Sequence, residues 1–228
     1  MIVVITGISR GIGKATIQRA LNLGYECIGL TRSETNIDPS IIENSNAHII
    51  EVNWSDPIKI VEMITMILKG RCIDVLINNA ATIKVVDLND TDLDTLMNQF
   101  RVNAILPFLL SKELLNANAF ARGAHIVNIG SMAGYQDSAK FPGLGAYSAS
   151  KAALACLTQS MAAEWGDQLS INCLCLGAVD TDMLKAAFPD YQAKISDVQM
   201  ASYIMHFAAS APELINGQVI SVKKDDPK

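Results

Sequence analysis

Short runs of apolar residues recur along the whole chain and alternate with longer segments of helical periodicity. Seven runs have the length of β-strands, and they cover residues 2–6, 27–31, 48–52, 73–77, 125–129, 171–176 and 218–222. Several are apolar at nearly every position, which is typical of parallel strands that are covered on both faces. The pattern therefore predicts a sheet that is buried between layers of helices.

Four longer segments between these strands have helical spacing and helix-end signals. They cover residues 11–24, 56–70, 91–116 and 147–166. The second opens with Asp56 as N-cap and Pro57 in the first turn, and the first, second and fourth end at glycine. The third contains Pro107, which predicts a kink because proline lacks the N–H group that an α-helix needs.

Strand and helix alternate from end to end without a linker or a repeat. This pattern predicts an α/β fold of the Rossmann type, a doubly wound, seven-stranded and mostly parallel sheet with helices on both faces. Residues 1–228 are expected to form a single domain. The least regular segments, 131–146 and 183–196, have the character of ligand-binding loops.

Composition excludes several classes of function. The formal net charge is −5, which gives no reason to expect a nucleic-acid partner. The first residues contain no basic region or cleavage site, and no apolar run is long enough to span a bilayer, so we expect a cytoplasmic protein without membrane contact.

The cysteines and histidines do not predict a metal site. Five cysteines and three histidines are scattered without metal-ligand spacing. Cys173 and Cys175 alternate within an apolar run, so they are expected to point to one face of a strand. We interpret the cysteines as buried, reduced thiols of a cytosolic protein.

A glycine-rich turn, "TGISRGIG", joins the first strand to the first helix. Glycines stand at positions 7, 11 and 13 of this stretch. Glycine permits a tight turn and lets the backbone approach a phosphate, while the following helix points free N–H groups at that phosphate. An ordinary strand-to-helix turn is the alternative, but the position at the head of a β-α-β unit favours a dinucleotide site.

Several further stretches share their order and spacing with one family. They are "NNAA" at 78–81, "RVNA" at 101–104, "IVNIGS" at 126–131, "YSASK" at 147–151, "LGAVDTDM" at 176–183 and "INGQVISV" at 215–222. Together with the glycine turn, they make the chain resemble the short-chain dehydrogenase/reductase family over residues 1 to about 222. This resemblance implies a nicotinamide cofactor bound by Gly7, Ser9, Arg10, Gly11, Ile12, Gly13, Thr31, Arg32, Asn53, Trp54, Asn79, Ala80, Ala81, Tyr147, Lys151, Gly177, Val179 and Thr181.

The residues that end the second strand bear on the choice of cofactor. In a Rossmann unit an acid at this point binds the ribose of NAD, whereas a nearby arginine accommodates the 2′-phosphate of NADP. Thr31 stands where a relative that prefers NAD has Asp, and Arg32 follows it, with Arg10 within the glycine turn. NADP(H) is therefore favoured over NAD(H), although Glu34 would oppose it. Two solvated surface arginines are the alternative.

The third strand ends in Asn53 and Trp54. The family usually has Asp at the position of Asn53, where it contacts the adenine amine, and the carbonyl oxygen of Asn can still accept from that amine. We interpret Trp54 as packed against the sheet rather than stacked on adenine.

Tyr147 and Lys151 stand four residues apart in "YSASK". Any helix surface can carry such a pair without function. A cation held close to tyrosine would lower its pKa from about 10 and fit it for proton transfer. The resemblance implies that Ser131 binds the substrate oxygen and that Asn103 holds a water in a proton relay through the lysine. Asn103, Ser131, Tyr147 and Lys151 are thus the candidate catalytic residues.

Two classes of function are compatible with this pattern. The first is an NADP(H)-dependent oxidoreductase that interconverts a small carbonyl compound and an alcohol. The second is a non-catalytic, NADP(H)-binding regulatory protein of the same fold, which would not need all four catalytic residues. The length of 228 residues leaves no room for the substrate domain of a sugar-nucleotide epimerase.

Assembly and substrate are less defined by the sequence. The apolar helices at 105–115 and 153–165, with the resemblance, imply a homo-dimer or homo-tetramer. The sequence departs from the family at Leu176, where proline is usual, in the long segment between Ser131 and Tyr147, and in the ending "KKDDPK". The substrate stays open among acyl thioesters, ketones, steroids and sugars.

Overall fold

The computed structural model describes residues 1–224, so the last four residues of the predicted domain 1–228 lie outside the described part. Seven strands form one sheet in the order β3-β2-β1-β4-β5-β6-β7, and every neighbouring pair is parallel. The strands are β1 (Ile2–Thr6), β2 (Glu26–Thr31), β3 (Ala47–Glu51), β4 (Ile73–Asn78), β5 (Phe120–Ser131), β6 (Leu169–Leu176) and β7 (Val219–Val222). The predicted seven-stranded Rossmann-type sheet is confirmed.

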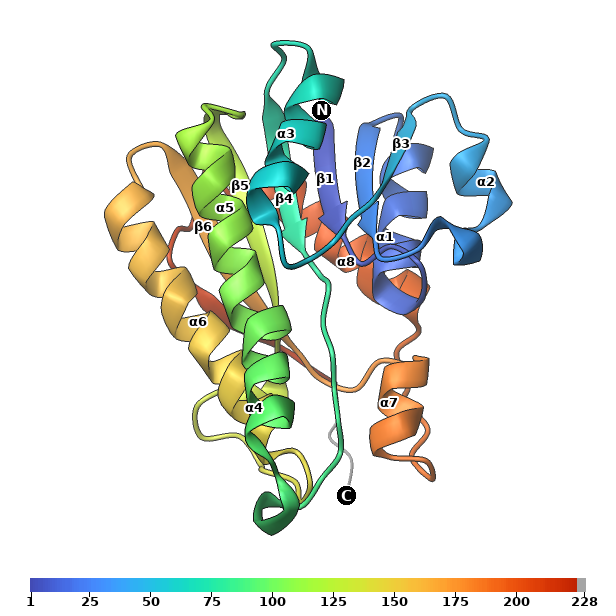
Figure 1. Cartoon of the computed structure of the whole chain (residues 1–228), viewed down its shortest axis with the longest axis vertical. Coiled ribbons are helices and arrows are strands. Elements are labelled where there is room, and N and C mark those ends of the chain that lie inside the picture. The colour runs from blue at the N-terminus through green and yellow to red at the C-terminus, as the bar shows by residue number, and fades with distance from the viewer. Residues whose placement is uncertain (225–228) are drawn as a thin grey trace.

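Helices cover both faces of the sheet, as predicted (Figure 1). One face is packed by α1 (Gly11–Asn22) and α8 (Asp197–Ser210), whose apolar sides share a core with β1. The other face is packed by α3 (Pro57–Leu68), α5 (Leu106–Asn116) and α6 (Gly145–Trp165). The shorter helices are α2 (Pro39–Ile42), α4 (Leu93–Phe100) and α7 (Asp182–Ala187).

The helix predicted over 91–116 is divided into α4 and α5 by a wide π-helical turn, Arg101–Ile105. In an α-helix, the carbonyl of Asn103 would accept from the N–H of residue 107, which is proline and has none. The N–H of Leu106 instead donates to the carbonyl of Arg101, five residues earlier. Pro107 therefore has the expected consequence, and the irregularity lies in the turn before it.

Helix α8 is not among the predicted helices, and α7 lies within the segment predicted as a loop. The signal for α8 was present, because Ser196 and Gln199 form a capping box at its start. Its central residues are apolar on more than one side, which weakens the helical period. These two misses fall after the sixth strand, and the short helix α2 was not predicted either.

The positions of the cysteines correct one prediction. Cys27, Cys173 and Cys175 are buried, but Cys72 and Cys156 are exposed. Exposure follows from their places, since Cys72 precedes β4 in a loop and Cys156 lies on the outer side of α6.

The sheet has its topological switch point between β1 and β4. The chain runs outward from β1 through β2 and β3, then returns to the other side of β1 with β4. The loops that follow β1 and β4 therefore diverge at the carboxyl edge, which is where open α/β sheets bind ligands.

Candidate active site

The turn after β1 has no space for side chains at its glycines. Gly7 and Gly11 have positive φ angles of 74° and 53°. A Cβ atom on Gly7 would lie 2.8 Å from the Cα of Ala80, and one on Gly13 would lie 2.1 Å from the carbonyl oxygen of Gly7. The side chain of Arg10 does not cap α1, so the first N–H groups of the helix remain directed at the loop. This geometry fits a phosphate group.

Thr6 and Asn79 fasten the glycine turn to the end of β4. The hydroxyl of Thr6 accepts from the N–H groups of Asn79 and Ala80, at 2.9 and 2.8 Å. The amide of Asn79 donates to the carbonyls of Thr6 and Gly7, at 3.0 and 3.1 Å. Asn79 thus holds the loop in shape, and a direct contact of Asn79, Ala80 or Ala81 with a cofactor stays a prediction.

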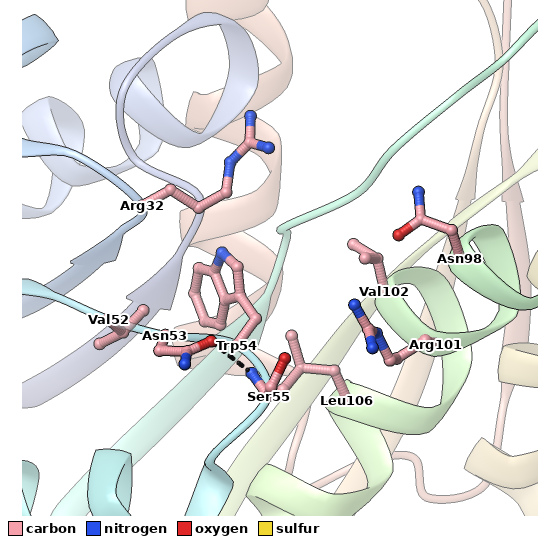
Figure 2. A pocket seen from close by; sticks show the side chains of 9 residues that line it. All are labelled: Arg32, Val52, Asn53, Trp54, Ser55, Asn98, Arg101, Val102 and Leu106. Carbon is pink, nitrogen blue, oxygen red and sulfur yellow. Dashed lines mark hydrogen bonds between the residues drawn. The ribbon is translucent and has the colours of Figure 1, made fainter. Parts of the chain in front are cut away.

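A cavity of about 330 Å³ opens beside the ends of β2 and β3 (Figure 2). It brings together Arg32, Asn53 and Trp54, three of the predicted cofactor-binding residues. The other lining residues were not predicted from the sequence; they are Val52, Ser55, Asn98, Arg101, Val102 and Leu106. Those on the helical wall were missed because nothing in the sequence places the end of α4 opposite β2.

Asn53 and Trp54 differ in part from their predicted roles. The side-chain oxygen of Asn53 accepts from the N–H of Ser55 at 3.0 Å, so one acceptor position is already used within the turn (Figure 2). The indole of Trp54 packs against the core on the α3 side, as expected, but it also lines the cavity.

Thr31 and Arg32 have different surroundings. Thr31 is buried, and its hydroxyl donates to the carbonyl of Ser33 at 2.9 Å, which closes the turn after β2. Arg32 is exposed, and within residues 1–224 neither Arg32 nor Arg10 forms an ion pair. Glu34, the expected opponent, has its backbone N–H bound to the carboxylate of Glu51 at 3.0 Å.

Ser131, Tyr147 and Lys151 meet at the carboxyl edge, near the middle of the sheet. Ser131 ends β5, and its side chain lies close enough to that of Tyr147 on α6 to act on the pKa of the phenol. The ammonium group of Lys151 donates to the carbonyl of Ile129 at 2.8 Å, and the residue is only 2 % exposed.

Burial shifts the pKa values of this pair. It raises the pKa of Tyr147 above its usual value, while the neighbouring side chain of Ser131 acts in the opposite direction. It lowers the pKa of Lys151 to about 8. The expectation that the lysine lowers the pKa of Tyr147 is therefore wrong for the protein by itself, because the loss of water around the phenolate outweighs the other effects.

Asn103 lies in the π-helical turn and is fully buried. Its side-chain oxygen accepts from the N–H of Thr82 at 2.8 Å, and its amide donates to the carbonyl of Thr82 at 2.9 Å and the hydroxyl of Ser150 at 3.0 Å. The side chain is thus occupied in joining α4, α6 and the segment after β4. Pro107 deprives its backbone carbonyl of an α-helical donor, and the predicted water-holding role of Asn103 stays a prediction.

The segment after β6 reaches back to the glycine turn. The N–H of Gly177 donates to the carbonyl of Val222 at 2.9 Å, and Val179 is buried. The methyl group of Thr181 lies 3.3 Å from where a Cβ of Gly11 would be, and its hydroxyl caps α7. Thr181 therefore lies beside the glycine turn, while cofactor contacts of Gly177, Val179 and Thr181 stay predictions. Leu176 replaces the usual proline.

Comparison with known proteins agrees with this geometry. The family model described as short chain dehydrogenase matches residues 1–192. The chain belongs to the short-chain dehydrogenase family.

The chain is similar over most of its length to proteins with different names. Protein FixR of Bradyrhizobium diazoefficiens is 32 % identical over 205 residues, which cover 85 % of this chain and 71 % of the relative. The 3-oxoacyl-[acyl-carrier-protein] reductase FabG of Vibrio harveyi is 28 % identical, covering 97 % and 95 %. A Burkholderia cenocepacia short chain dehydrogenase solved in complex with NADP superposes with a TM-score of 0.84 at 25 % identity, covering 97 % and 95 %.

The described residues offer neither a metal site nor a membrane-spanning helix. Within residues 1–224, no group of three or more His, Cys, Asp or Glu residues could hold a metal ion. Among the same residues, no helix has the length and hydropathy needed to cross a bilayer.

Proposed function

We propose that this protein is an NADP(H)-dependent oxidoreductase that interconverts a carbonyl and an alcohol by hydride transfer, with Tyr147 as general acid and base. The observation that carries the proposal is the placement of Ser131 at the end of β5 together with Tyr147 and the buried ammonium group of Lys151 on α6, at the carboxyl edge of the sheet.

The four catalytic candidates take complementary roles in this proposal. A nicotinamide cofactor, when bound, would supply the hydride for the carbonyl carbon, and negative charge would develop on the carbonyl oxygen. The hydroxyl of Ser131 donates to that oxygen, and Tyr147 gives it a proton. Lys151 orients the cofactor ribose and the tyrosine. The tyrosinate then regains its proton from Lys151, and a water on the carbonyl of Asn103 supplies the proton to Lys151.

The protonated state of Tyr147 is compatible with reduction. Burial raises its pKa, so the phenol holds its proton at neutral pH and has a proton to donate in the reductive direction. The lowered pKa of Lys151, about 8, allows that group to exchange protons near neutrality. The reductase activity named for the FabG relatives supports the same direction.

Preference for NADP(H) over NAD(H) rests on Arg32 and Arg10, which have no ion-pair partner in the described chain, and on the absence of an acid at Thr31. The NADP-bound Burkholderia relative supports it. A 4-hydroxyisoleucine dehydrogenase, 25 % identical with a TM-score of 0.80, was instead solved in complex with NADH, so structural neighbours with either cofactor exist. We further propose that the protein acts in the cytoplasm, as a homo-dimer or homo-tetramer, on a small-molecule carbonyl or alcohol.

The decisive test is single-turnover hydride transfer in Tyr147→Phe, with a ketone first identified by an NADPH-consumption screen. The change removes one hydroxyl and keeps the ring, so folding and NADPH affinity should persist. The rate should fall by roughly 10²–10⁴, the usual contribution of a positioned acid. Tyr203→Phe, an exposed tyrosine on α8, is the matched control and should react at the original rate. An unchanged rate in Tyr147→Phe would show that the hydroxyl is not the acid.

A further inference from the structure

The cavity beside β2 and β3 carries two positive charges and no negative one. Arg32 and Arg101 both line it, and none of the other lining residues is Asp or Glu. The whole chain has a net charge of −5, so this cavity departs from the rest of the molecule. Such a site favours an anionic or electron-rich ligand.

The two arginines reach the cavity from different elements. Arg32 follows the end of β2, where a Rossmann unit meets the adenosine ribose. Arg101 begins the π-helical turn after α4, one wide turn before Leu106, which also lines the cavity. Figure 2 shows Arg32 on the strand side and Arg101 on the helix side of Trp54. The two arginines can therefore contact different parts of one ligand.

The rest of the lining suits a flat aromatic ring. Trp54 presents an indole, and Val52, Val102 and Leu106 add apolar surface. The amides of Asn53 and Asn98 offer hydrogen-bonding groups at the margin. A cavity of about 330 Å³ is at the small end of the range for ligand sites, so it can take one nucleoside rather than a whole dinucleotide.

On the basis of the proposed NADP(H) function, we propose that Arg101 is a further cofactor-recognition residue. It binds the adenine base, which lies between the guanidinium of Arg101 and the indole of Trp54, and it leaves the 2′-phosphate to Arg32. A planar guanidinium stacks on an aromatic ring, and a base gains further stabilisation from an indole.

The roles of the two arginines can be separated by two nucleotides, 5′-AMP and 2′,5′-ADP, which share the base and differ in the 2′-phosphate. The chain has two tryptophans, so Trp165→Phe leaves Trp54 as the only indole. Quenching of its fluorescence then reports binding without any catalytic turnover. All further variants are made in this background.

We expect Arg101→Met to weaken binding of both nucleotides by the same factor, roughly three- to thirty-fold, with their affinity ratio unchanged. Arg32→Met should instead reduce the preference for 2′,5′-ADP over 5′-AMP. Arg101→Lys keeps the charge but loses the planar group, so it should restore only part of the affinity. Arg122→Met, an exposed arginine of β5, is the matched control and should bind as before.

Three results would overturn the inference. Unchanged affinities in Arg101→Met would place Arg101 outside the site. Loss of the 2′,5′-ADP preference in that variant would make it a phosphate ligand instead. Full recovery in Arg101→Lys would reduce its role to charge. If the protein without these changes bound neither nucleotide, the proposed function would fail together with the inference.

Discussion

Lys151 holds a positive charge inside the protein at a cost to folding. Its ammonium group has one carbonyl acceptor, on Ile129, and burial lowers its pKa from 10.5 to about 8. A buried cation with so few partners is unfavourable for stability. The hydroxyl groups of a bound ribose would give the ammonium group further acceptors. The unfavourable burial of Lys151 is therefore consistent with a role in binding the cofactor ribose.

The first prediction concerns this residue. Lys151→Met should raise the free energy of unfolding at pH 7, by up to about 3 kcal/mol, because it removes the buried charge and keeps most of the volume. Denaturant unfolding would measure the difference. Lys59→Met, at an exposed position on α3, is the control and should change stability by less than about 0.5 kcal/mol.

The pH dependence of that difference identifies its cause. Between pH 8 and 10.5 the unfolded chain keeps a proton that folded Lys151 has released, so the stability of the original protein rises with pH in this window. The Met variant lacks this rise. The gap between the two proteins should therefore narrow from pH 8 to 10.5, and a constant gap would contradict the burial of a charged lysine.

At the scale of elements, the glycine turn and the first turn of α1 depend on close backbone contact. A Cβ on Gly13 would lie 2.1 Å from the carbonyl of Gly7 and 2.4 Å from the amide of Asn79. Both atoms take part in the hydrogen bond between the amide of Asn79 and the carbonyl of Gly7, which holds the glycine turn in shape. A methyl group at position 13 would therefore displace the whole turn.

Gly13→Ala should destabilise the fold by about 1–3 kcal/mol, the usual cost of overpacking, and weaken binding of 2′,5′-ADP because the loop must shift. Gly24→Ala is the matched control. Gly24 also ends a helical segment, with a φ of 78°, but no atom lies within 4 Å of its Cβ position. It should cost about 1 kcal/mol of stability and leave nucleotide affinity unchanged. Unaltered binding in Gly13→Ala would show that the turn is not the phosphate cradle.

The π-helical turn connects two functions at this same scale. Pro107 opens the helix, Asn103 secures the segment after β4, and Arg101 lines the cavity. One proline thus sets the positions of a catalytic candidate and a cofactor candidate together.

At the scale of the whole molecule, the exposed apolar surface bears on assembly. Among the large apolar side chains of the helices expected to form an interface, 105–115 and 153–165, only Ile105 is exposed, and the others are buried or half-buried. More exposed apolar side chains lie on the neighbouring helix α4, where Leu93 is 70 % and Met97 is 51 % exposed. Leu88, which precedes α4, is 73 % exposed. We therefore expect the interface to include α4.

Sedimentation should show a species larger than the 24.6 kDa subunit at micromolar concentration. Replacing Leu93 and Met97 together by Lys should shift the protein to the monomer, since two charges would have to be desolvated in the interface. Met66→Lys, on α3 and 75 % exposed, is the control and should not alter the assembly. A monomer before any substitution would contradict the proposal.

The sequence by itself determined the sheet and the residues at its carboxyl edge. Strand runs that are apolar at nearly every position, such as 2–6 and 73–77, are typical of parallel strands that helices cover on both faces. The glycine spacing is equally local, because the backbone angles at Gly7 and Gly11 exclude most other residues. Ser131, Tyr147 and Lys151 were found by their order along the chain.

Only the tertiary structure decided how these groups behave and what lies opposite them. The raised pKa of Tyr147 and the lowered pKa of Lys151 come from burial, which depends on the packing of α6 and not on the spacing of the pair. Arg101 was missed because it shares no local pattern with Arg32, 69 positions earlier in the chain. Their common cavity exists because the switch point of the sheet brings the end of β2 opposite α4, a relation between distant segments that neither periodicity nor spacing contains.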